Sequence, residues 1–480
     1  MKHLYKFLLG ISLVSVFLLV YSPHFSYKYP LHVDEWQHLA RGIHILENKQ
    51  ISFINPYFIP NPLVPEENYY PNFEIGFHLF LAIFFYITHL NPILFYRFFP
   101  AIFAVLSAFL LFNLIYYLTR KFYIALFSIL FFAALKININ ISGLWFFTPL
   151  TFALPFLFLF LFLFFKSLDS QDNKFLILSI LIFLILFIIH PISVILIYFI
   201  ILLFLFINFN KMYFRCSIPF ILSPLLLAFI FILFVWKESI LNLKFLITDW
   251  LILEEGWGYV ELKYFLPSFY NIIPFSLAII GIYPSIKNSK LRLFVIWFLL
   301  TSFLIFIFHN FKFSILIPYQ RILYYSFLSL VPLSAIGLYF ILNKIKKYKF
   351  IIFILFTLVF YFTFYNYYNL PPESQLYHVI EDKDYDALEF LSNYNNKIIM
   401  SPLKMSVAIY PITKNYVIAM TKGNLPDREI QIVKDFYSTD CNKKKEIIDI
   451  YNIDFIISEN KLNCNFLKEI YSKGDYIYEA

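Results

Sequence analysis

Charged residues, glycine and cysteine are all scarce in this chain. Of its 480 residues only 14% are charged and 61% are hydrophobic, whereas a soluble globular chain has about 25% charged residues. So few charges cannot cover a soluble surface, and the composition also excludes a disordered chain and a coiled coil. Ten glycines and three cysteines exclude a collagen repeat and a disulfide-rich scaffold. The composition therefore predicts a protein that crosses a membrane several times.

Several common enzyme motifs are missing as well. The sequence has no Walker A, G-x-G-x-x-G, H-E-x-x-H or G-x-S-x-G motif and no C-x-x-C pair. These motifs indicate bound nucleotide, zinc or a nucleophilic serine, so an enzyme that uses a cytosolic nucleotide is not expected. Nucleic acid is not an expected partner either. The net charge of +8 comes from basic residues in short loops between apolar runs, where membrane topology explains them.

Eleven apolar runs are predicted to cross the membrane as helices, which need about 20 apolar residues to do so. The first run follows Lys2 and Lys6 and precedes no small-residue cleavage site, which is typical of a retained anchor. His190-Pro191 divides residues 175–209 into two spans, because that run is too long for one untilted helix. The predicted spans are residues 7–21, 98–118, 122–139, 144–165, 175–189, 191–209, 216–236, 267–286, 293–309, 319–342 and 350–368.

Basic residues set the predicted orientation. If the apolar run 73–90 lies at the membrane interface instead of crossing, alternate loops collect 15 Lys/Arg on one side. The acidic residues of two long loops, 22–97 and 237–266, then lie on the other side. The positive-inside rule makes the basic side cytoplasmic. We therefore predict a multi-pass protein of the plasma membrane with a cytoplasmic N-terminus, and the long loops and residues 370–480 outside.

Residues 370–480 differ from the rest of the chain, with 17 Asp/Glu against 13 Lys/Arg. Strand-like and helix-like stretches alternate there, so an extracytoplasmic α/β domain is predicted to follow the transmembrane domain 1–369. Cys441 and Cys464 can pair outside the cytoplasm, although unpaired thiols are the simpler interpretation. The expected helices are 384–394, 427–437, 442–452 and 461–471, and the expected strands are 397–400, 416–419, 454–458 and 475–478.

The adjacent carboxylates Asp34 and Glu35 are the sharpest candidates for chemistry. They lie in the segment His32-Val-Asp34-Glu35-Trp36-Gln37-His38. Adjacent residues do not share a helical face, so one carboxylate can face a reactant while the other supports it. Alternatively, Asp34 is only the N-cap of a helix over residues 34–46. The tryptophan and two histidines beside the pair favour catalysis, with Asp34 as the base and Glu35 as its support or alternate.

Cationic side chains near the predicted outer face are candidates for binding an anionic ligand. Arg321 begins an apolar span, with Tyr319 beside it and Lys312 in the preceding loop. An arginine there suits a bidentate contact to phosphate, and the alternative is snorkelling into headgroups. His78, in the interfacial run, is equally consistent with a headgroup contact and with snorkelling to water. His190 is either a ligand or a packing residue at a helix end.

One further candidate lies in the second long outer loop. Glu254, Glu255 and Trp257 bring carboxylates together with aromatic rings, as the lining of a sugar site does. An aromatic belt at the membrane interface has a similar composition. Both interpretations stay open.

Five features follow one another along the chain: the retained first helix, Asp34-Glu35, the segment from Tyr70-Pro71 to Phe77-His78-Leu79, the span between Arg97 and Arg120-Lys121, and Arg321. In this order of features, the chain resembles the GT-C-fold glycosyltransferases. The relatives in question are protein O-mannosyltransferases, the bacterial lipid A aminoarabinose transferase and related prokaryotic enzymes, and the resemblance covers about residues 1–370. The tail segment IIDIYNIDFIISEN, residues 447–460, also resembles the outer domain of many prokaryotic members.

The resemblance implies a sugar donor carried on polyprenyl phosphate, an acidic catalytic residue at Asp34, and phosphate contacts at positions such as His78 and Arg321. A divalent metal is compatible with it. However, the next predicted outer loop, residues 136–143, has no acidic residue. A metal site formed by one acidic residue from the first outer loop and one from this loop is therefore not expected. The sugar (a hexose or a pentose) and the acceptor (protein, glycan or lipid) stay open, and membrane lipids are the other expected partners.

The reaction that the resemblance implies has simple chemical requirements. A polyprenyl phosphate leaves without being protonated, so the reaction needs a base for the acceptor hydroxyl and cations for the developing phosphate charge. An in-line displacement inverts the anomeric centre. A transporter or flippase is the first alternative. It predicts charged residues within the spans and two similar halves of the sequence, whereas the predicted spans are nearly free of charge and the sequence has no two similar halves. The second alternative is a scaffold whose outer domain binds a partner.

Overall fold

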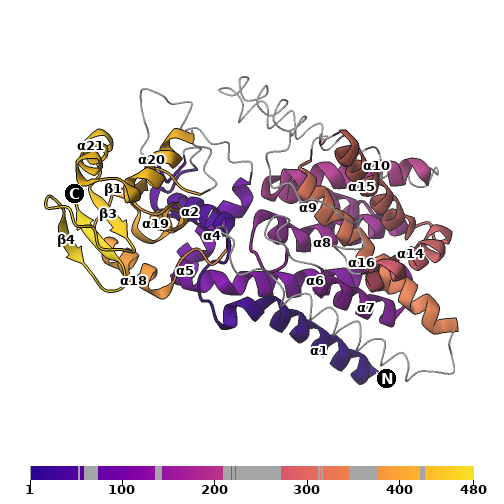
Figure 1. Cartoon of the computed structure of the whole chain (residues 1–480). Helices are drawn as coiled ribbons and strands as arrows, with labels where there is room; N and C mark the ends of the chain where they lie inside the picture. Colours follow the sequence, from indigo (N-terminus) through magenta and orange to yellow (C-terminus); the bar gives the residue numbers. More distant parts are fainter. Residues whose placement is uncertain are drawn as a thin grey trace. The chain divides into compact units, whose positions relative to one another are not determined.

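The computed structural model describes residues 2–51, 55–58, 74–135, 143–208, 218, 222, 272–311, 314, 317–344, 377–421 and 427–480. The chain divides into two compact units (Figure 1). The first unit joins Met1–Ser22 to Phe99–Leu370, and the second joins Pro23–Phe98 to Pro371–Ala480. The first outer loop of the sequence prediction therefore packs with the C-terminal residues. The sequence predicted a transmembrane domain of residues 1–369 and an outer domain of residues 370–480. The compact units are defined by packing and not by the membrane, so that division stays a prediction.

The first unit is a bundle of apolar helices. Every predicted span that falls on described residues overlaps one of these helices, and the spans 216–236 and 350–368 lie outside the continuous described segments. In the bundle α6 packs against α1, α7 and α8, and α14 packs against α16. The helices are α1 (Lys2–Tyr21), α6 (Phe99–Thr119), α7 (Phe122–Ala133), α8 (Pro149–Ser170), α9 (Asn173–Ile189), α10 (Pro191–Ile207), α14 (Ile272–Lys287), α15 (Arg292–Phe311) and α16 (Tyr319–Lys344).

Five helices of the described segments are long and apolar enough to cross a membrane. The protein is therefore a membrane protein, as its composition predicted. The remaining apolar helices have 10–17 residues, so the count of eleven spans stays a prediction. The five long helices cover His3–Phe25, Pro92–Thr119, Pro149–Ser170, Arg292–Phe311 and Tyr319–Lys344.

The break between α9 and α10 follows from the residues at the junction. Pro191 is the first residue of α10, where a proline loses no hydrogen bond and its fixed φ suits the helix. His190 caps both helices, because its backbone N–H donates to the Leu186 carbonyl oxygen and its side chain accepts from the Ser193 N–H. The predicted helix break at His190-Pro191 is confirmed, while the crossing of the membrane by both helices stays a prediction.

The second unit contains two helices from the N-terminal part, α2 (Val33–Asn48) and α4 (Ile75–Thr88), and the short elements η1 (Ser22–Phe25), α5 (Pro92–Phe95) and η2 (Tyr96–Phe98). These belong with a five-stranded sheet of order β2-β1-β3-β5-β4. β1 is parallel to β2 and β3, while β5 is antiparallel to β3 and β4. The strands are β1 (Ile398–Met400), β2 (Tyr416–Val417), β3 (Phe455–Ser458), β4 (Lys468–Tyr471) and β5 (Tyr476–Glu479).

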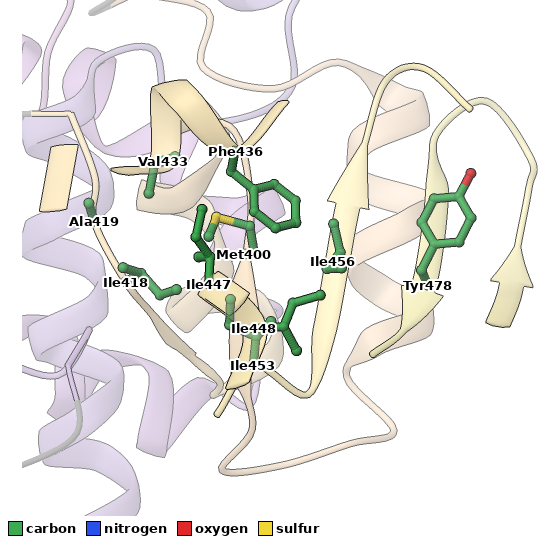
Figure 2. Close-up of a cluster of buried hydrophobic side chains, with 10 residues drawn as sticks. All are labelled: Met400, Ile418, Ala419, Val433, Phe436, Ile447, Ile448, Ile453, Ile456 and Tyr478. Atoms are coloured by element: carbon green, nitrogen blue, oxygen red, sulfur yellow. The ribbon is translucent and has the colours of Figure 1, made fainter. Parts of the chain in front are cut away.

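Helices cover both faces of the sheet, which is why all four residues of β3 are buried. On one face, side chains of α20 (Asp427–Ser438) and α21 (Cys441–Tyr451) form the hydrophobic cluster in Figure 2 with side chains of β1, β3 and β5. On the other face lies α18 (Asp382–Leu391), whose Phe390 ring is 5.2 Å from the Tyr471 ring. The cluster consists of Met400, Ile418, Ala419, Val433, Phe436, Ile447, Ile448, Ile453, Ile456 and Tyr478.

Two predictions for the C-terminal residues are wrong, and one helix was missed. The expected helix 461–471 is a loop followed by β4, because Lys468–Tyr471 pairs with β5 along the sheet edge. The helix α19 (Leu403–Thr413) was not predicted, and Pro411 near its end weakens its sequence pattern. Cys441 and Cys464 form a disulfide, with their Cα atoms 5.6 Å apart, so the interpretation as unpaired thiols fails.

Candidate functional site

The start of α2 is built around two buried side chains, His32 and Glu35. The Nδ1 atom of His32 accepts a hydrogen bond from the Asp34 N–H at 3.1 Å. The Glu35 Oε2 atom accepts from the N–H groups of Leu31 (2.8 Å) and His32 (3.0 Å). This capping box satisfies amides that a helix start otherwise leaves open. The N-cap is His32, so the alternative that Asp34 caps the helix is wrong.

Asp34 is the partly exposed carboxylate of the pair. Its side chain is 23% exposed, whereas Glu35 is completely buried. The Asp34 Oδ2 atom lies 3.5 Å from His32 Nδ1. His38 and Arg41 follow Asp34 at spacings of four and seven residues, so the three side chains share one face of α2. The adjacent carboxylates therefore have different surroundings: Glu35 holds the helix start, and Asp34 opens toward solvent.

The face of α2 that carries His38 meets the start of α4. His38 Nδ1 lies 3.0 Å from His78 Nε2 and 3.9 Å from Glu74 Oε2. His78 is fully buried. Burial lowers the pKa of His78 well below its ordinary value, and the neighbouring His38 and Arg41 lower it further. His78 is thus neutral near pH 7 and hydrogen-bonded to His38, and its contact with a headgroup stays a prediction.

A glycine lets α2 and α4 approach this closely. A Cβ atom added at Gly42 would lie 2.8 Å from Leu81 Cβ, which is closer than real Cβ atoms come. The opposite face of α4 carries exposed apolar side chains at helical spacing, namely Ile83, Tyr86 and Ile87. α4 therefore packs on α2 with one face and exposes apolar side chains on the other, and its placement at the membrane interface stays a prediction.

The C-terminal residues of the second unit hold α2 along its length. The Tyr57 hydroxyl lies 3.2 Å from the Trp36 carbonyl oxygen and 2.6 Å from that of Val407 in α19. Farther along α2, His44 Nδ1 lies 2.7 Å from the Tyr410 hydroxyl. The helix that carries Asp34 is thus fixed by residues more than 350 positions later in the chain.

In the first unit, His190, Tyr319 and Arg321 are all described. Tyr319 and Arg321 lie in the first turn of α16, where the Tyr319 hydroxyl is 3.0 Å from His309 Nε2. His190 is buried, and its Nδ1 atom lies 2.5 Å from Ser193 Oγ. Ser193 also contacts the Tyr325 hydroxyl, one turn after Arg321. The two candidates at the start of α16 therefore lie on the same turn, and His190 packs at a helix junction.

Four predicted site residues, Lys312, Glu254, Glu255 and Trp257, lie outside the described residues. Among the described residues, no group of three or more His, Cys, Asp or Glu side chains could hold a metal ion. His38 Nδ1 and His78 Nε2 hydrogen-bond to each other. The divalent metal compatible with the resemblance therefore has no donor set among the described residues.

Sequence reasoning missed part of this arrangement. The spacing of Asp34, His38 and Arg41 was a usable signal, because residues four and seven apart share a helical face. No local pattern in the sequence indicates the contact of His38 with His78 and Glu74, because that contact depends on how α2 packs against α4. The bridge between His32 and Tyr377 joins segments 345 residues apart, which one sequence does not predict.

Comparison with known proteins supports the fold. No protein-family model matches the sequence, and no curated protein is significantly similar to it. The structure is similar to that of an oligosaccharyltransferase from Archaeoglobus fulgidus in its apo form, with a TM-score of 0.64 and 12% identity over 96% of this chain and 70% of that chain. The complex of that enzyme with Zn and sulfate gives a TM-score of 0.63 and 15% identity over 94% and 68% of the two chains.

A third structure of the same enzyme, tethered with an acceptor peptide containing the NVT sequon, gives a TM-score of 0.56 and 13% identity over 96% of this chain and 69% of that chain. The chain therefore has the GT-C fold of an archaeal oligosaccharyltransferase. The predicted GT-C-like fold is confirmed, and the number of spans stays a prediction. The closer resemblance to O-mannosyltransferases and the aminoarabinose transferase stays a prediction.

Proposed function

We propose that this protein is an integral membrane glycosyltransferase that moves a sugar from a polyprenyl-phosphate carrier to an acceptor hydroxyl. The observation that carries the proposal is Asp34, a partly exposed carboxylate at the start of α2, in a chain with the fold of an oligosaccharyltransferase. Glu35 and His32 fix its backbone, so the base would be preorganised by the helix start.

In the proposed reaction the acceptor oxygen attacks the anomeric carbon of the donor sugar. The bond from that carbon to the phosphate oxygen breaks, and polyprenyl phosphate leaves as an anion. Asp34 takes the proton of the acceptor hydroxyl as the new bond forms. An in-line displacement of this kind inverts the anomeric centre.

Arg321 is the proposed contact for the leaving phosphate. Its place in the first turn of α16 puts a permanent cation at the end of an apolar helix, and a guanidinium matches two phosphate oxygens at once. Tyr319, on the same turn, and Lys312 are proposed to assist it. Glu254, Glu255 and Trp257 are the proposed sugar-side contacts.

The test of this function is a reconstituted transfer reaction. The protein is placed in liposomes with radiolabelled polyprenyl-phosphate sugar and an extract of acceptors. Transfer releases free polyprenyl phosphate in amounts equal to the sugar that leaves the lipid phase, and Arg321→Ala should weaken donor binding. A flippase would instead leave the label on intact lipid while changing the side of the membrane on which it is accessible.

The disulfide of the second unit supports the proposed orientation. Disulfides persist outside the cytoplasm and are rare inside it, and Cys441 and Cys464 are joined here. The proposed sidedness, with the second unit outside and a cytoplasmic N-terminus, makes a prediction. In whole cells expressing a Cys216→Ser variant, a maleimide reagent should label the chain only after reduction. Labelling of both thiols without reductant would contradict an extracytoplasmic second unit.

A further inference from the structure

Two carboxyl groups, Asp384 and Asp475, are buried together in the second unit. Asp475 is completely buried and Asp384 is 7% exposed, and the two side chains lie within hydrogen-bonding reach of each other. Asp384 Oδ2 accepts a hydrogen bond from the Glu381 N–H at 2.7 Å. Asp384 Oδ1 and both carboxylate oxygens of Asp475 have no hydrogen-bond donor among the described residues. Three buried oxygens therefore depend on something other than an N–H group.

The two residues come from elements that touch directly. Asp384 is in the first turn of α18, and Asp475 lies in the turn just before β5. Gly474 adopts a φ of +96°, and a Cβ atom added to it would lie 2.8 Å from Lys383 Cβ. Only glycine allows the turn to lie this close to α18. The carboxyl pair thus lies at the contact between α18 and the turn.

The surrounding charges do not neutralise two buried carboxylates. Lys383 Nζ lies 3.7 Å from Asp475 Oδ1, but this lysine side chain is 40% exposed. The charge of Lys383 is also shared with Glu381 and Glu459. Among the described residues, Tyr27 lies near Asp384 and Tyr471 near Asp475. Two buried negative charges facing one partly hydrated ammonium are costly. A single proton held between the two carboxyl groups removes this cost.

Burial, together with the hydrogen bond and the charge of Asp475, raises the pKa of Asp384 to about 7. A protonated Asp384 donates its hydroxyl to Asp475, which gives one of the buried oxygens the donor that it lacks. The other Asp384 oxygen remains free to accept from Glu381, so the cap of α18 is kept in both protonation states.

The start of α18 is also the place where the C-terminal residues hold the segment that leads into α2. The Tyr27 hydroxyl donates to the Ile380 carbonyl oxygen at 2.9 Å, and the Tyr29 hydroxyl donates to Asp382 Oδ1 at 2.9 Å. The backbone N–H of His378 donates to the Leu31 carbonyl oxygen at 2.9 Å. Residues 377–382 therefore run beside residues 27–32, immediately before Asp34.

We propose that Asp384 and Asp475 form a pH-dependent latch. While the two carboxyl groups share one proton, the start of α18 stays attached to the turn before β5, and the segment before α2 stays attached to residues 377–382. When that proton leaves to water, the two carboxylates repel each other and α18 opens more easily from the turn before β5. The latch does not depend on the proposed transferase activity, since it concerns only how firmly residues 377–391 are held.

The direction of the pH dependence follows from the raised pKa of Asp384. In the opened state this carboxyl group has an ordinary pKa near 4, so between about pH 4 and pH 7 only the closed state keeps the proton. The stabilisation is complete below about pH 4 and is lost as the pH rises to about 7. Over that interval the opening equilibrium should increase by up to about tenfold per pH unit, and above pH 7 it should stay constant.

Amide hydrogen exchange of the full chain in lipid nanodiscs tests the latch. Peptides covering residues 377–391 and 471–479 are followed from pH 5 to pH 8.5, with rates corrected for the intrinsic effect of pH. In the wild type, protection should fall up to about pH 7 and then level off. In Asp384→Asn it should not vary with pH, because the amide donates to Asp475 permanently and its oxygen still accepts from Glu381.

Asp386→Asn is the matched control, because Asp386 is an exposed acid on the same helix and should keep the wild-type dependence. If Asp384→Asn does not fold, Asp475→Asn makes the same test, since its amide donates to Asp384. A wild-type protection that is constant between pH 5 and pH 7 would overturn the latch. So would an asparagine variant whose protection falls as steeply as that of the wild type. Neither result bears on sugar transfer.

Discussion

Asp34→Asn is expected to lower the rate of sugar transfer by about 10²–10⁴-fold, the range that a general base contributes. The substitution keeps the size of the side chain and the backbone N–H that donates to His32, so α2 should start where it does in the wild type. Donor binding should change little, because the proposed phosphate contacts lie on α16. The loss should therefore appear in kcat, measured with radiolabelled donor in liposomes.

Two controls separate a lost base from a disturbed fold. Asp386→Asn removes an exposed acid from α18 and should leave transfer unchanged. Asp34→Glu keeps a carboxylate and should retain part of the activity. If Asp34→Asn transfers sugar at the wild-type rate, the base lies elsewhere and Asp34 has only a structural role.

Gly337→Leu should destabilise the first unit by about 3 kcal/mol or more, at the upper end of overpacking effects. A Cβ atom at Gly337 would lie 1.9 Å from the Leu277 carbonyl oxygen, and one at Gly281 would lie 2.0 Å from that of Leu333. The backbones of α14 and α16 thus touch at these glycines, as helices in membranes do where small residues meet. The midpoint of denaturant unfolding in detergent measures the effect.

Gly10 of α1 is the matched control, because nothing lies within 4 Å of a Cβ atom added there. Gly10→Ala should be neutral or stabilise by up to about 1 kcal/mol through helix propensity. Gly281→Leu should resemble Gly337→Leu. Equal stability of Gly337→Leu and the wild type would mean that α14 and α16 do not pack through these residues.

The apolar pattern of the sequence predicted where most helices begin and end. The junction at His190-Pro191 was readable because a proline starts a helix easily and interrupts one, and α10 begins at Pro191. The strands β1, β3 and β5 fall within one residue of the expected stretches. Short buried runs bounded by polar residues are a strong local signal when both faces of a strand are covered.

Other features depend on contacts that no local pattern records. Residues 461–471 have apolar spacing that resembles a helix, but the disulfide at Cys464 and the pairing of β4 with β5 decide their structure. The sequence predicted Asp34 as the base and left open whether Glu35 is its support or an alternate base. Only the hydrogen bonds of Glu35 to Leu31 and His32 distinguish the buried support from the partly exposed carboxylate.

The most direct measurement is single-turnover transfer with the donor already bound. The wild type and Asp34→Asn are loaded with the same amount of radiolabelled polyprenyl-phosphate sugar, and acceptor extract is then added. The wild type should transfer the label and release one polyprenyl phosphate per sugar, while Asp34→Asn should keep its donor intact over the same time. Donor that stays intact on the wild type, or transfer at equal rates by both proteins, would contradict a glycosyltransferase that uses Asp34 as its base.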